Sequence, residues 1–175
     1  MKFLKFLEFI LLLTILLISN LGFCATVDEI KKQIEIVEQD YSLPKNLLLA
    51  IVQQESDFNV KARLKNSYGL GQVTTQTARF HCGIRKVKDL YDYETNLDCA
   101  ARVLKYQLER YRNSTYYAIA AYNSGTPFIC TGSKFKRKLG SHLVQYLGPC
   151  KKSGMVHNIA YVSGVQKKWH IFNNT

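Results

Sequence analysis

The sequence predicts a mainly α-helical protein built as one domain. Several segments repeat apolar residues at intervals of three and four, as in helices that bury one face. We find no segment with the convincing alternation of apolar and polar residues that marks a strand. The 175 residues are enough for one hydrophobic core, and no repeat or proline-rich hinge divides them.

Residues 1–24 are predicted to be an export signal, which leaves residues 25–175 as the domain. Two lysines precede an apolar run, and small residues follow near Cys24. A lipid-modified Cys24 and an uncleaved membrane anchor are the alternatives. Lipoprotein signals carry a small residue where this chain has Phe23, so we expect a periplasmic or secreted protein.

The first helix of the domain is predicted over residues 26–41. Thr26 and Glu29 have the spacing of a capping box, in which each side chain accepts a hydrogen bond from the other residue's backbone N–H. The apolar stripe of this helix consists of Val27, Ile30, Ile34 and Val37. The stripe indicates which face of the helix is buried.

The next helix is predicted over residues 42–56, because Ser42 and the early Pro44 are typical of a helix start. The same apolar spacing predicts further helices at 74–81, 94–112, 114–123 and 155–172. The longest of them has its apolar stripe on Leu97, Ala101, Leu104 and Leu108. Residues 125–153 are rich in glycine and lysine, and we expect a long basic loop with one short helix. Such a loop is either a surface insertion or one wall of a groove for an anionic polymer.

Four cysteines remain after the predicted signal: Cys82, Cys99, Cys130 and Cys150. An even number in an exported chain predicts two disulfides, and three connectivities exist. We favour Cys82–Cys99 with Cys130–Cys150, because each pair closes a local loop. Free buried thiols are the alternative. No CxxC pair or histidine-rich cluster is present, so neither a zinc site nor another cofactor is predicted.

The formal net charge of +11 predicts an anionic partner. Nucleic acid, a membrane surface and an acidic polymer all satisfy that condition. The predicted export argues against nucleic acid, and no nucleic-acid-binding motif accompanies the scattered basic residues.

Glu55 stands at the end of the apolar stretch "LLLAIVQQES". On a helix it shares a face with Leu48, Ile51 and Val52, which are predicted core residues. Burial disfavours the charged form, so we expect the pKa of Glu55 to be raised. A carboxyl held protonated near neutral pH suits a general acid for glycosidic cleavage. The alternative is an ordinary exposed or salt-bridged glutamate at a helix end.

Two further motifs carry groups that suit a sugar ligand. "GLGQ" at residues 69–72 combines glycines that permit close approach with the amide of Gln72, which can both donate and accept. "AYN" places Tyr122 and Asn123 at a helix end. Taken singly, the first motif also fits a glycine-rich turn, and the second fits a packed tyrosine beside a cap.

Together, "ES" at 55–56, "GLGQ" at 69–72 and "AYN" at 121–123 resemble the lytic transglycosylases with a soluble lytic transglycosylase (SLT) domain. The resemblance covers about residues 42–126 and continues weakly in "HNIAYVSGV". It implies a lysozyme-like single domain with a catalytic cleft, stapled by disulfides. It also implies cleavage of peptidoglycan glycan strands between N-acetylmuramic acid and N-acetylglucosamine, with a 1,6-anhydro end as product.

By this resemblance Glu55 is the catalytic acid and then the base, and Tyr122 positions it through its hydroxyl. The resemblance implies a substrate-binding set of Ser56, Gly69, Leu70, Gln72, Tyr122, Asn123 and Tyr161. Gly71 departs from the family, which often has methionine or another apolar residue there. A side chain that would pack on the sugar is therefore missing at this position.

Two rival functions use the same residues differently. A hydrolytic muramidase needs a second carboxylate to activate water. The candidates for it are Asp57, Asp89, Asp92, Glu94 and Asp98. A non-catalytic peptidoglycan-binding module needs the groove without the acid. In its small size, the chain also resembles the specialised transglycosylases that accompany secretion, conjugation or pilus systems.

Overall fold

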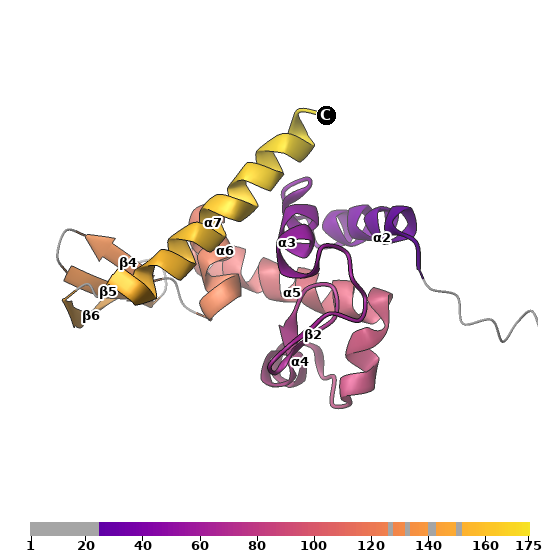
Figure 1. The fold of residues 1–175 in the computed structure, drawn as a ribbon, viewed down its shortest axis with the longest axis horizontal. Helices are drawn as coiled ribbons and strands as arrows, with labels where there is room; N and C mark the ends of the chain where they lie inside the picture. The colour runs from indigo at the N-terminus through magenta and orange to yellow at the C-terminus, as the bar shows by residue number, and fades with distance from the viewer. Residues whose placement is uncertain (1–24, 126–127, 132–133, 140–142, 150–151) are drawn as a thin grey trace, which may run out of the picture.

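The structure is a computed structural model that describes residues 25–125, 128–131, 134–139, 143–149 and 152–175. Its helices confirm the predicted mainly α-helical class (Figure 1). They are α2 (Val27–Asp40), α3 (Leu47–Ser56), α4 (Thr75–Cys82), α5 (Tyr93–Arg110), α6 (Thr115–Ser124) and α7 (Lys152–Asn173), with the 3₁₀ helix η1 (Val87–Tyr91) before α5. The predicted signal at residues 1–24 lies outside the described residues. Among those described, no helix combines the length and apolar character needed to cross a membrane.

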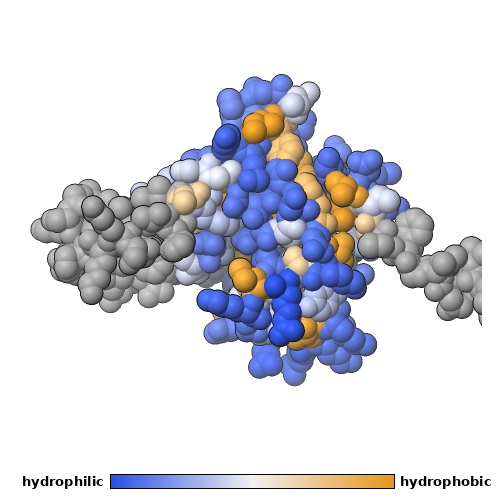
Figure 2. Space-filling view, viewed as in Figure 1, coloured by the Kyte–Doolittle hydropathy of each residue, from blue (hydrophilic) through white to orange (hydrophobic). Residues whose placement is uncertain are grey.

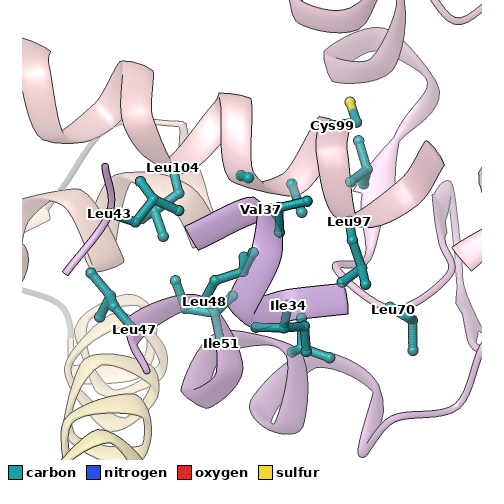
Figure 3. Packing of buried hydrophobic residues seen from close by; sticks show 14 of the residues in the cluster. Ile34, Val37, Leu43, Leu47, Leu48, Ile51, Leu70, Leu97, Cys99 and Leu104 are labelled. Atoms are coloured by element: carbon teal, nitrogen blue, oxygen red, sulfur yellow. The ribbon is translucent and has the colours of Figure 1, made fainter. Parts of the chain in front are cut away.

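Helix α5 is the centre of the fold. It contacts α2, α3, α4 and α6, while α7 runs past α6 and α3 to the C-terminus (Figure 1). Its predicted stripe is buried, at 0 to 3% exposure, in Leu97, Ala101, Leu104 and Leu108. Figure 3 shows α5 residues packing with apolar side chains of α2 and α3. The amphipathic pattern therefore predicted the buried face of α5 correctly.

The capping box that begins α2 is confirmed. The Thr26 backbone N–H donates to Glu29 Oε2 at 2.8 Å, and the Glu29 backbone N–H donates to Thr26 Oγ1 at 3.3 Å. Ile30, Ile34 and Val37 are buried as predicted. Val27 is 46% exposed, so its assignment to the core was wrong. It is the first helical residue and projects beyond the end of the core.

Helix α3 begins at Leu47, later than the start predicted from Ser42 and Pro44. Asn46 precedes it in the left-handed conformation, and its side chain makes no cap hydrogen bond. The cap comes from α2 instead, because Glu38 accepts from the backbone N–H of Asn46 at 2.8 Å and from that of Leu48 at 2.7 Å. A carboxylate from a neighbouring helix thus stabilises the α3 N-terminus.

Two antiparallel sheets contradict the prediction that the chain has no strands. β1 (Arg63–Leu64), β2 (Ser67–Tyr68) and β3 (Val73–Thr74) form one, in the order β1-β2-β3. β4 (Phe128–Thr131), β5 (Lys134–Leu139) and β6 (Leu143–Pro149) form the other, where a loop with a short helix was expected. Two-residue strands are too short to show a period, and the lysine-rich composition of β5 conceals the second sheet.

The predicted disulfide between Cys82 and Cys99 is present and joins α4 to α5. The two residues are separated by 17 positions in sequence. The second predicted pair involves Cys150, which lies outside the described residues.

Candidate active site

Glu55 lies in the last turn of α3, beside the apolar face of that helix. Leu48, Ile51 and Val52 are fully buried, and Glu55 is half-buried. Burial raises the pKa of Glu55 to about 7, as the sequence predicted, and a hydrogen bond from Tyr161 acts in the opposite direction. The helix ends directly afterwards at Asp57, whose φ is 49°. A carboxyl with this pKa can both give and take a proton near neutral pH.

Tyr161 on α7 is the side chain that holds Glu55. Its hydroxyl donates to Glu55 Oε1 at 2.7 Å. Burial, the first cause, and the nearby Glu55 charge raise the pKa of Tyr161 well above its usual value, so the hydroxyl keeps its proton. The hydrogen bond therefore runs from tyrosine to carboxyl and stabilises the ionised form of Glu55.

The contact between α7 and α3 explains why Tyr161 reaches this position. Gly164 faces Gln54 of α3 so closely that a Cβ atom would stand 2.8 Å from Gln54 Oε1. One turn further, Lys168 Nζ donates to the same oxygen at 2.9 Å. Positions 161, 164 and 168 share a helix face, so the close approach at Gly164 brings Tyr161 against Glu55.

The "GLGQ" segment forms a tight loop held from below by Asn96 of α5. Gly69 has a φ of 72°, and a side chain there would overlap the Asn96 amide and the Leu90 carbonyl. The Gly71 backbone N–H donates to Asn96 Oδ1 at 2.8 Å. Gln72 follows with a φ of 47°, and its Nε2 donates to the Gly69 carbonyl at 3.0 Å. These contacts fix the backbone from which the Gln72 side chain projects.

Asn96 was missed by the sequence analysis. It has no exposed surface, and its Nδ2 donates to the carbonyls of Tyr68 and Leu90 at 2.9 and 2.8 Å. With the bond from Gly71, both N–H groups and the oxygen of the amide have partners. The signal in the sequence was an asparagine beside Leu97 on the apolar side of a long amphipathic helix, where a polar residue needs buried partners.

Tyr122 has a different partner from the one expected. Its hydroxyl donates to the Gly71 carbonyl at 2.9 Å, and the expected hydrogen bond to Glu55 comes from Tyr161 instead. A Cβ atom at Gly71 would stand 2.6 Å from Ala100 Cβ and 2.8 Å from the Tyr122 hydroxyl. The glycine that departs from the family pattern thus makes room for this tyrosine contact.

A groove of about 170 Å³ opens in front of Glu55. Its walls are made by Glu55, Leu64, Ser67, Gly71, Gln72, Val73, Thr74, Thr77, Val103, Tyr122 and Asn123. Four expected site residues, Glu55, Gln72, Tyr122 and Asn123, therefore share one groove. Ser56 and Leu70 do not line it, since the Ser56 hydroxyl donates to the Val52 carbonyl of its own helix at 3.1 Å and Leu70 is fully buried.

The arrangement of a half-buried acid, a glycine-rich loop and a tyrosine–asparagine helix end has a counterpart among known proteins. A sequence model described as the transglycosylase SLT domain matches residues 32–141, which is more than half of the chain. The chain belongs to the SLT domain family. The match includes Glu55, the "GLGQ" loop and the "AYN" segment, whereas Tyr161 lies beyond it.

Two solved structures resemble this SLT domain. One is the 70 kDa soluble lytic transglycosylase Slt70 from Escherichia coli, at 20% identity and a TM-score of 0.50, with 80% of this chain and 22% of that one covered. The other is an inactive mutant of lytic transglycosylase Slt from Pseudomonas aeruginosa, at 24% identity and a TM-score of 0.49, with 54% of this chain and 16% of that one covered. The likeness to Slt70 supports the lysozyme-like fold, and the chain spans less than a quarter of either protein.

The other candidate acids of the SLT domain lie elsewhere. Asp57, Asp89, Asp92, Glu94 and Asp98 are all absent from the groove walls. Asp92 caps α5 by accepting from the Thr95 backbone N–H at 2.9 Å. Asp98 accepts from the Tyr41 hydroxyl at 2.7 Å. Among the described residues, Glu55 is the one carboxyl that lines the groove, and no acid, histidine and cysteine cluster there could hold a metal ion.

A larger hollow of about 690 Å³ lies between α2, α3 and the end of α7, where Figure 2 shows hydrophobic surface. Leu43, Leu49 and Phe172 contribute its apolar wall. Its buried carboxylate, Glu38, already accepts the backbone N–H groups that cap α3. Its other carboxylate, Glu35, is exposed to solvent. The smaller groove is therefore the candidate active site, because its acid is both perturbed and free to face a ligand.

Proposed function

We propose that this SLT domain is an exported peptidoglycan lytic transglycosylase. It cleaves the glycosidic bond between N-acetylmuramic acid and N-acetylglucosamine and leaves a 1,6-anhydro end on the muramic acid. The observation that carries the proposal is Glu55, whose carboxyl has a pKa of about 7. Among the described residues it is the one carboxyl that lines the groove. Membership of the SLT family supports the substrate class.

In the first step the protonated Glu55 donates its proton to the glycosidic oxygen. The bond from C1 of the muramic acid to that oxygen breaks, and the electron pair leaves with the N-acetylglucosamine. The carboxylate that results is stabilised by the Tyr161 hydroxyl at 2.7 Å. Burial supplies the protonated acid beforehand, because it raises the pKa of Glu55 to about 7.

In the second step the ionised Glu55 accepts the proton of the muramic acid 6-hydroxyl. The oxygen of that hydroxyl attacks C1 and closes the 1,6-anhydro ring, so that Glu55 regains its proton and no water is consumed. A second carboxylate is not required, in contrast to hydrolysis by a pair of acids. Gln72 and Asn123 line the groove beside Glu55 and offer amides to sugar hydroxyl and N-acetyl groups.

The proposed location is the periplasm or the medium, after removal of residues 1–24. The formal net charge, which is +11 for the full chain, suits an anionic wall polymer. Local opening of the wall for a secretion, conjugation or pilus assembly is the cellular role that we propose, by analogy with small specialised transglycosylases. Deletion of neighbouring assembly genes and co-purification of their products would test that role.

The chemistry is tested by digestion of purified peptidoglycan and mass analysis of the muropeptides. We expect products that end in anhydro-muramic acid, one water lighter than reducing ends. Reducing ends would instead identify a hydrolytic muramidase. Glu55→Gln should abolish product formation, and full activity in that variant would disprove the assignment of the acid.

A second measurement on the same variant, binding to peptidoglycan, distinguishes the enzyme from the non-catalytic binding module. Glu55→Gln should still sediment with insoluble peptidoglycan, because the groove walls are unchanged. Asp57→Asn is a matched control, since Asp57 is an exposed carboxylate two residues away and outside the groove. A wild-type protein that binds peptidoglycan without releasing any muropeptide would establish the binding module.

A further inference from the structure

Three rings, which we call the aromatic stack, contact one another edge to face and at a tilt on the surface where α4 meets α5. The Phe80 and His81 ring centroids lie 4.9 Å apart at an interplanar angle of 81°, and those of His81 and Tyr106 lie 4.7 Å apart. Phe80 is 80% exposed and Tyr106 is 41% exposed, with the half-buried His81 between them. The stack therefore presents apolar ring surface to solvent.

This aromatic stack adjoins the groove in front of Glu55. Thr77 on α4 and Val103 on α5 both line that groove. His81 follows Thr77 by four positions and Tyr106 follows Val103 by three, so each of these rings stands about one helical turn, roughly 5 Å, from a residue of the groove wall. The stack is therefore a neighbour of the groove where α4 contacts α5.

The backbone that carries two of these rings is fixed to α5. The disulfide between Cys82 and Cys99 joins α4 to α5 directly after His81. Helix α4 ends at Cys82, and the φ of 71° at Gly83 lets the chain turn away. A backbone fixed in this way has less conformational entropy to lose when a ligand binds.

Phe80 contributes little to the fold in its exposed position. Burying a phenylalanine side chain gains about 1.5 to 3 kcal/mol, and this gain is not realised in the free protein. Burial lowers the pKa of His81, which keeps the middle ring uncharged at neutral pH. The stack is thus an uncharged aromatic surface in a protein with a large positive charge.

The area of the aromatic stack favours a sugar ring over a protein partner as its ligand. A protein partner would need about 20 to 30 residues on each side, far more than three rings. One pyranose ring, with its apolar C–H face, matches the area of one or two aromatic rings. The neighbouring groove is lined by amide and hydroxyl groups that suit sugars.

We propose that Phe80, His81 and Tyr106 form a distal stacking subsite for a sugar ring of the glycan strand that occupies the Glu55 groove. This subsite rests on the proposed function. It binds a ring beyond those held in the groove, so it favours long strands over short fragments.

The test measures binding of N-acetylglucosamine oligomers of two and six rings by calorimetry, in the full chain carrying Glu55→Gln. We expect Phe80→Ala and Tyr106→Ala each to weaken hexamer binding by about three- to tenfold, which corresponds to about 0.7 to 1.4 kcal/mol. The ratio of hexamer to dimer affinity should fall. Tyr106→Phe keeps the ring and should keep the ratio.

Tyr116→Ala is the matched control, because Tyr116 on α6 is 42% exposed and lies outside the groove. An unchanged hexamer affinity in Phe80→Ala and Tyr106→Ala would overturn the subsite. An equal loss for dimer and hexamer, or an equal loss in Tyr116→Ala, would also overturn it. The assay needs no catalysis, so failure of the proposed function is recognised separately by the muropeptide products of the wild-type chain.

Discussion

Two tyrosine hydroxyls lie close to Glu55, and they perform different tasks. Tyr161 donates to the carboxyl at 2.7 Å, whereas Tyr122 donates to the Gly71 carbonyl at 2.9 Å. The first hydrogen bond favours the ionised acid and so lowers its pKa, against the larger effect of burial. The second fixes the loop that carries Gln72. The sequence analysis assigned the positioning of Glu55 to Tyr122 and placed Tyr161 among the substrate-binding residues, whereas the hydrogen bond to the acid comes from Tyr161.

The pH dependence of the reaction should report this difference. Glu55 must carry its proton in the free enzyme, so kcat/KM should fall tenfold per pH unit above a pKa of about 7. Tyr161→Phe removes a contact that lowers this pKa. The pH above which kcat/KM falls, called the pH limb below, should therefore be higher in this variant. The substitution should also reduce kcat by about ten- to a hundredfold, because the carboxylate formed in the first step loses its donor.

Tyr122→Phe is the control for this experiment, with peptidoglycan turnover followed from pH 5 to pH 9. Its limb should stay at the wild-type position, since Tyr122 bonds to Gly71 and not to Glu55. A limb that moves in Tyr122→Phe and stays fixed in Tyr161→Phe would return the positioning role to Tyr122.

Among the elements, the approach of α7 to α3 decides whether the acid and its tyrosine meet. Gly164 permits that approach, because even a methyl group there would press on Gln54. In a helix interior, glycine costs about 0.5 to 1 kcal/mol relative to alanine. The presence of a glycine inside α7 is therefore explained by packing against α3.

Gly164→Leu should separate α7 from α3. We expect a loss of about 1 to 3 kcal/mol in the free energy of unfolding from overpacking, and a fall in kcat with the same upward shift of the pH limb as Tyr161→Phe. Ser163→Leu adds a large side chain at an exposed position of the same helix and should leave both quantities unchanged. Wild-type kinetics in Gly164→Leu would show that the α3–α7 contact does not control Tyr161.

The elements that the sequence predicted well are those whose signals are local. The capping box of α2 and the stripe of α5 need neighbours within one or two helical turns. The start of α3 was misplaced because its cap, Glu38, belongs to another helix. The strands were missed because β1, β2 and β3 have two residues each, and pairing over such lengths leaves no period to detect.

For the whole molecule, the sequence motifs predicted where the site lies, whereas the contacts within it depend on how the helices pack. Glu55, Gln72, Tyr122 and Asn123 line one groove, as the resemblance to the SLT family implied. The choice of Tyr161 as the partner of Glu55 depends on how α7 docks 106 positions further along the chain. The partners of Asn96 could not be predicted for the same reason, since they come from η1 and from β2.

The disulfide between Cys82 and Cys99 affects the stability of the whole molecule, because it joins α4 to the central helix α5 beside the groove. Closing a loop of 17 positions is worth about 3 kcal/mol. In a domain of this size, 1 kcal/mol shifts the melting temperature by about 2 to 4 °C. Replacing both cysteines by alanine should therefore lower the melting temperature by about 6 to 12 °C, as measured by circular dichroism under non-reducing conditions.

Adding a reductant distinguishes the effect of this disulfide from that of the second predicted one. If Cys130 and Cys150 are also paired, reduction should lower the melting temperature of the double variant further, and alkylation with mass analysis should count two newly accessible thiols. A double variant that melts with the wild-type protein would show that helix packing alone holds α4 on α5. The aromatic stack beside the bridge supplies a second readout, because loosening α4 should weaken hexamer binding more than dimer binding.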